Sequence, residues 1–141
     1  MSIFKNVNFY IITSLILYSL FCFKSYSNEP YGDDFLLIKD QYLGKDEKFL
    51  DNSKIKIIIQ DEVEESHEVS MVVKIPNKLK NTGKIFILVD NNPIQLVTKI
   101  FPKKPLKSVG FNIRMEQDSY VRAIILDENN IWNVASKKSN S

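Results

Sequence analysis

Two stretches decide the fold class: residues 85–89 read IFILV, and residues 108–115 read SVGFNIRM. The second stretch alternates polar and apolar residues, and its apolar positions are Val109, Phe111, Ile113 and Met115. A period of two predicts a strand with one buried face and one face in water. The first stretch is apolar at every position, which predicts a central strand that is covered on both faces.

The same strand pattern extends over most of the chain. From Ile55 onward, β-prone segments alternate with turn-rich segments such as Asp90–Pro93 (DNNP) and Asp127–Asn130 (DENN). Seven strands are predicted, over residues 55–59, 69–75, 85–89, 94–101, 109–115, 120–126 and 131–135. Short antiparallel strands in this number are typical of an all-β, immunoglobulin-like sandwich of two sheets.

The segment before the strands has a different pattern. Apolar residues at 35, 38 and 42 recur at helical spacing and Gly44 follows, so a short helix is predicted over Phe35–Leu43. This helix would cover the far face of strand 85–89. Residues 45–53 are predicted to be a polar connection. The expected organisation is a lead-in and helix over 28–54, a sandwich over 55–136 and a polar tail over 137–141.

The N-terminus has the composition of a secretory signal peptide. Lys5 precedes an apolar run over residues 9–23, and Ser25-Tyr26-Ser27 supplies small residues at the spacing of a cleavage site. We expect cleavage after Ser27, so that residues 1–27 are removed and the mature protein is periplasmic. An uncleaved N-terminal anchor is the alternative, and it also places the domain outside the cytoplasm.

Export changes the charge and the cysteine content of the mature protein. Lys5 and Lys24 are two of the 19 basic residues, so removal of residues 1–27 leaves 17 basic side chains against 17 acidic ones. A neutral domain attracts neither nucleic acid nor an anionic membrane surface. The single cysteine, Cys22, would leave with the signal peptide, and the mature chain would then have no thiol for a disulfide, a metal or a carried group.

Several stretches in a fixed order resemble a known family. They are residues 40–44 (DQYLG), 87–93 (ILVDNNP), 98–101 (TKIF), 111–115 (FNIRM) and 119–123 (SYVRA). Together they are similar to the SoxY carrier of sulfur oxidation, and more closely to SoxYZ-like carrier proteins associated with periplasmic quinoprotein dehydrogenases. The resemblance covers about residues 35–135.

The resemblance implies an exported binding or accessory module in sulfur oxidation or methanol oxidation. It implies a protein partner, which would be a SoxZ-like chain, a quinoprotein dehydrogenase or a second copy. The family continues into a glycine-rich arm with a carrier cysteine, which does not follow Trp132 here, so no residue receives the carrier role. A structural or adhesive sandwich without a link to redox metabolism is the alternative.

Val97 and Phe101 are the predicted partner-binding residues. They are predicted to share one side of strand 94–101, with Ile94, Leu96 and Ile100 on the other side, so that one small core cannot cover both. No catalytic residue and no cofactor are predicted, because the sequence has no nucleophile elbow and no phosphate loop. A weak metal-dependent alternative is centred on His67, which lies among the acidic residues of 61–68.

Overall fold

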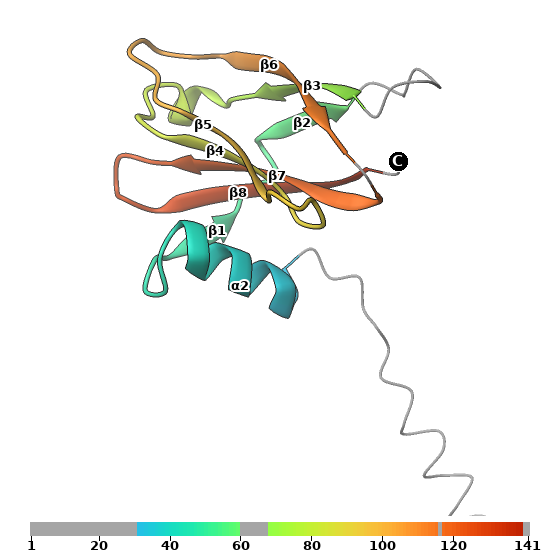
Figure 1. Cartoon of the computed structure of the whole chain (residues 1–141). Coiled ribbons are helices and arrows are strands. Elements are labelled where there is room, and N and C mark those ends of the chain that lie inside the picture. Colours follow the sequence, from blue (N-terminus) through green and yellow to red (C-terminus); the bar gives the residue numbers. More distant parts are fainter. Residues whose placement is uncertain (1–30, 60–67, 116, 140–141) are drawn as a thin grey trace, which may run out of the picture.

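Two sheets stacked as layers, with one helix against the outer face of the larger sheet, form the protein (Figure 1). The structure is a computed structural model that describes residues 31–59, 68–115 and 117–139. The larger sheet has the order β1-β8-β7-β4-β5, with bounds Phe49–Asp51, Trp132–Ser139, Ser119–Leu126, Ile85–Val89 and Leu96–Ile100. The smaller sheet has the order β2-β3-β6, with bounds Lys56–Ile59, Glu68–Lys74 and Ser108–Arg114. The helices are α2 (Asp33–Tyr42) and a 3-10 turn, η1 (Asn77–Leu79). The predicted all-β sandwich with a short N-terminal helix is therefore confirmed.

Apolar side chains fill the space between the two sheets, and we call this region the inter-sheet layer. Its buried members are Ile55, Ile57, Val69, Met71, Val73, Ile75, Leu79, Ile85, Ile87, Val89, Ile113, Met115, Val121, Ala123, Ile125 and Ala135. The alternation that was predicted for residues 108–115 is present, because β6 pairs with β3 only and directs its odd-numbered residues inward. Burial of this apolar surface is the main force that holds the sheets together.

A second apolar layer lies between the larger sheet and α2, and we call it the helix-side layer. Its buried apolar members are Phe35, Ile38, Phe86, Leu88, Ile124, Trp132 and Val134. All five residues of β4 are buried, since odd positions face the inter-sheet layer and even positions face the helix. This confirms that the helix covers strand 85–89. Gly44 follows the helix with a φ of 120°, a conformation that favours glycine.

One strand was not predicted, and the bounds of two others were predicted wrongly by more than one residue. Strand β1 lies within the predicted polar connection, and it pairs in parallel with β8 through Phe49 and Trp132. Three residues with little burial are too few to show a pattern of alternation. Strand β8 continues to Ser139 instead of ending at residue 135, because its backbone pairs with β7 as far as Ser119. The polar stretch from residue 137 therefore begins inside a strand, and β5 is shorter than predicted.

In the part of the chain that the structure describes, no helix is long and apolar enough to cross a bilayer. The predicted signal peptide and His67 lie outside the described residues, so the predictions made on them are not tested.

Candidate functional site

The predicted partner-binding residues lie at β5, an edge strand of the larger sheet, and we call residues 94–101 the β5 edge. The ladder between β4 and β5 contains an irregularity: Ile87 is opposite Thr98, and Leu88 is opposite Leu96. Val97 is therefore an extra residue between two pairs, as in a β-bulge. A bulge changes which residues share a face, and no pattern in the sequence indicates it.

The bulge separates the two predicted residues. Val97 and Ile100 are half-buried against the inter-sheet layer, whereas Leu96 packs against the helix-side layer. Phe101 leaves the strand toward the helix-side layer, where its ring meets Phe86 edge to face at 6.4 Å. The prediction that Val97 and Phe101 share one side of the strand is therefore wrong, while their role in binding a partner stays a prediction.

Both ends of the β5 edge expose large apolar side chains. Ile94 is 74% exposed and Phe101 is 59% exposed. Phe101 is the outermost ring of an aromatic row, since Phe86 packs on Trp132 with 5.1 Å between ring centroids. The Lys99 ammonium lies 5.2 Å from the centroid of the Phe86 ring, one ring behind Phe101 in this row. The row thus reaches the surface at one aromatic side chain.

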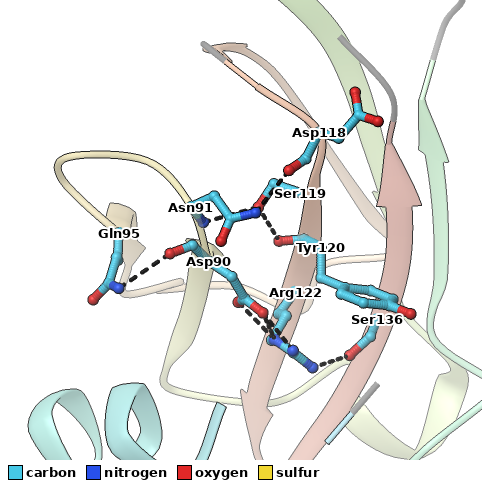
Figure 2. Close-up of polar contacts among 8 residues, drawn as sticks. All are labelled: Asp90, Asn91, Gln95, Asp118, Ser119, Tyr120, Arg122 and Ser136. Carbon is cyan, nitrogen blue, oxygen red and sulfur yellow. Dashed lines mark hydrogen bonds and ion pairs between the residues drawn. The ribbon is translucent and has the colours of Figure 1, made fainter. Parts of the chain in front are cut away.

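A buried ion pair stands beside this edge, between the larger sheet and the helix (Figure 2). Arg122 of β7 donates from Nε to both carboxylate oxygens of Asp90, at 2.8 and 3.0 Å, and its Nη2 also binds Asp90. Its Nη1 donates to Ser136 Oγ at 2.8 Å, and the guanidinium lies 4.2 Å from the centroid of the Phe35 ring. The side chain of Arg122 is 2% exposed and that of Asp90 is 9% exposed.

The ion pair continues into a set of hydrogen bonds that hold the turn before β5, as Figure 2 shows. Asn91 is bound to the β6–β7 loop and the start of β7: its N–H donates to Ser119 Oγ, and its side-chain amide donates to the carbonyl of Asp118. The carbonyl of Asn91 accepts from the Gln117 amide at 2.7 Å. The amide of Gln95 donates to the carbonyl of Asp90 at 3.1 Å. The turn that leads into the β5 edge is therefore fixed on both sides.

The ion pair was not predicted from the sequence. One signal was present, because Arg122 interrupts the apolar run of residues 121–126, and an arginine at such a position needs a buried partner. The partner Asp90 was identified only as a turn residue. Since Arg122 is enclosed by Asp90, Ser136 and Phe35, its geometry is that of a structural support and not of a substrate site.

No group of histidine, cysteine and acidic side chains able to hold a metal ion occurs among residues 31–59, 68–115 and 117–139. A groove of about 610 Å³ lies at the far end of the sandwich between η1 and the β7–β8 turn. Asp127 lies in this groove. Burial raises the pKa of its carboxyl, but hydrogen bonds from the Ile131 N–H, the Asn133 amide and the Asn129 N–H outweigh burial and lower the pKa.

The fold and the β5 edge define a class: an immunoglobulin-like β-sandwich domain with a covering helix and exposed apolar side chains at the β5 edge. The family model described as sulfur oxidation protein SoxY matches residues 39–139, and the chain belongs to this family. No curated protein sequence matches the chain.

Solved structures agree with this assignment at the level of the fold. The sulfur carrier protein SoxY from Chlorobium limicola f thiosulfatophilum superposes with a TM-score of 0.64 at 14% identity, over 77% of this chain and 91% of that chain. A superoxide reductase (neelaredoxin) variant from Ignicoccus hospitalis gives a TM-score of 0.48 at 12% identity, over 61% of this chain and 79% of that chain. The second similarity is too low to bear on function.

Proposed function

We propose that this protein is an exported accessory module of sulfur oxidation, which binds a SoxZ-like partner through the β5 edge. The observation that carries the proposal is the exposure of Ile94 and Phe101 at the two ends of an edge strand. Exposed apolar side chains beside unpaired strand backbone are a common basis of protein association. Membership of the SoxY family supports the metabolic setting.

The surrounding structure supports a preformed binding surface. The turn before β5 is held by the Asp90–Arg122 pair, and Phe101 packs on Phe86, which in turn packs on Trp132. A rigid surface loses little conformational entropy when a partner binds. Val97 has a supporting role in this proposal, because it is half-buried and fixes the bulge that shapes the edge.

The described domain would bind a partner protein and would not carry a covalently attached group. Residues 31–139 contain no cysteine, and a thiolate is the group that attacks sulfur compounds in a carrier of this kind. The proposal includes export, which the apolar run at residues 9–23 supports.

The test measures association of protein purified from the periplasmic fraction, whose N-terminus is first established by intact mass. A mass that corresponds to a start at Asn28 is expected. Wild type should bind a SoxZ-like chain from the same source or elute as a dimer, and Phe101→Asp should weaken association at least tenfold, about 1.4 kcal/mol.

The matched control is Leu37→Asp, which places the same charge on a 70% exposed apolar residue of the helix. It should leave association unchanged. A wild type that stays monomeric at high concentration and binds no SoxZ-like chain would contradict the proposal and favour a structural or adhesive role. Equal losses in both variants would place the interface away from the β5 edge.

A further inference from the structure

The opposite edge of the larger sheet is only partly covered. Strand β8 has eight residues, but β1 pairs with residues 132–134 only. Asn52 then donates its N–H to the Val134 carbonyl, and the chain leaves for β2 in the other sheet. Among the described residues, the second half of β8 therefore has no hydrogen-bonded strand on this side, although β2 of the other sheet passes close to β8.

The direction of the free backbone groups follows from the pairing. The N–H of Trp132 donates to Lys48 and the carbonyl of Val134 accepts from Asn52, so even-numbered residues of β8 direct their backbone toward β1. Because the period of a strand is two, Ser136 and Lys138 direct theirs to the same side. Each presents one N–H and one C=O beyond the end of β1.

A cavity of about 360 Å³ is lined by Ser136 and its neighbours Ala135 and Lys137, one residue short of Lys138, and we call it the β8 notch. Its floor is apolar, formed by Ile55, Ile57 and Ala135 between the sheets. Its rim carries Lys56 and Lys137, together with Asp51, whose carboxylate accepts a 2.6 Å hydrogen bond from the Tyr31 hydroxyl. Two lysines against one aspartate give the rim a net positive charge.

We propose that the β8 notch binds an extended peptide segment of a partner protein, which adds to the sheet as a strand beside Ser136 and Lys138. The peptide carries an apolar residue and, two positions away, an acidic residue. The apolar side chain enters between Ile55 and Ile57, and the acidic side chain meets Lys137 on the same face of the new strand.

Three features favour a peptide strand over a small molecule. The free N–H and C=O groups repeat at the spacing of a strand, which an extended backbone matches. The cavity is lined by three consecutive residues of β8, Ala135, Ser136 and Lys137, so an added strand would place alternate side chains next to it. The apolar floor and basic rim specify two different side chains at a separation of two residues. The proposal does not depend on the β5 edge, which lies at the other side of the sheet.

The probe is the blocked peptide acetyl-Thr-Val-Thr-Glu-Thr-amide, added at millimolar concentration to the full mature protein. Binding should slow amide hydrogen exchange at Ser136 and Lys138 and leave the amides of β5 unchanged. Lys138→Pro removes the N–H of Lys138, which forms no bond to β7, so the sheet should remain intact. This variant should bind the peptide about three- to tenfold more weakly than Lys138→Ala, which keeps the N–H.

A charge variant gives a second readout that does not depend on proline. Lys137→Glu should weaken binding of the glutamate peptide and strengthen binding of a peptide with lysine in its place. Thermal unfolding checks that each variant is folded. Unchanged exchange at Ser136 and Lys138 with saturating peptide would overturn the proposal, and the lysines would then serve to protect the edge. Equal binding by the proline and alanine variants would also overturn it.

Discussion

The two apolar layers of this protein are built on different principles. The buried members of the inter-sheet layer are all apolar and almost all aliphatic, and each strand contributes them at alternate positions. The helix-side layer combines Phe35, Phe86 and Trp132 with a buried arginine, and its polar atoms are bound to specific partners such as Asp90 and Ser136. The stability of the inter-sheet layer depends on how well apolar side chains fill the space. The stability of the helix-side layer depends also on the hydrogen bonds and the ion pair of its buried polar atoms.

This difference predicts which substitutions should destabilise the fold most. A change of one methylene group in the inter-sheet layer costs about 1 kcal/mol, because neighbouring side chains can partly relax. A lost partner in the helix-side layer leaves a charge in an apolar environment, which is far more costly. The turn that leads to the β5 edge is attached to this second layer through Asp90.

Removal of Asp90 is expected to give the largest effect. Asp90→Ala leaves the Arg122 guanidinium buried and without its carboxylate, and the free energy of unfolding should fall by about 3–5 kcal/mol. Urea unfolding followed by circular dichroism measures the change. Ile87→Val, in the inter-sheet layer, should cost about 0.5–1.5 kcal/mol and serves as the matched comparison.

A double replacement separates the effect of the ion pair from the effect of apolar packing. Asp90→Leu with Arg122→Met removes both charges and keeps apolar contacts around Phe35, so most of the lost stability should return. If the double variant is as unstable as Asp90→Ala, the hydrogen bonds of the turn matter more than the buried charge, and the proposed contrast between the layers is wrong.

The same contrast explains what could be predicted from the sequence. Alternation at residues 108–115 predicts the inter-sheet layer, because a sheet with one buried face imposes a period of two. The apolar run at 85–89 predicts a central strand buried on both faces, as β4 is. No local sequence pattern marks the buried ion pair, because Asp90 and Arg122 are far apart in the sequence and are brought together by the pairing of β4 with β7. The bulge at Val97 and the short strand β1 depend likewise on tertiary contacts that local sequence does not encode.

Tyr31 provides a smaller, pH-dependent test at the border of the helix-side layer. Burial and the hydrogen bond to Asp51 raise the pKa of Tyr31 from 10.0 to about 12. A raised pKa in the folded state means that the stabilisation is present below pH 10 and is lost as the pH rises toward 12. Tyr31→Phe should therefore cost about 1 kcal/mol at pH 8, and the difference from wild type should shrink above pH 10. A difference that stays constant from pH 8 to 12 would show that the Tyr31 hydroxyl is not coupled to folding.

Asp127 should give the smallest effect, because it is a carboxylate outside both layers. It lies in the β7–β8 turn, where it accepts hydrogen bonds from the N–H groups of Asn129 and Ile131, each at 2.9 Å. These bonds hold its pKa below the ordinary value of 3.8, so its contribution is present above about pH 4 and is lost as the pH falls through the lowered pKa.

Asp127→Asn keeps a neutral acceptor in the turn and removes the charge. We expect it to lower the free energy of unfolding by about 0.5 kcal/mol at pH 7, in the range of solvent-exposed substitutions, and we expect the difference from wild type to be smaller at pH 2. Urea unfolding at the two pH values measures both. A loss at pH 7 as large as that of Asp90→Ala would mean that the number of hydrogen bonds, and not burial of charge, determines the cost of removing a carboxylate from this fold.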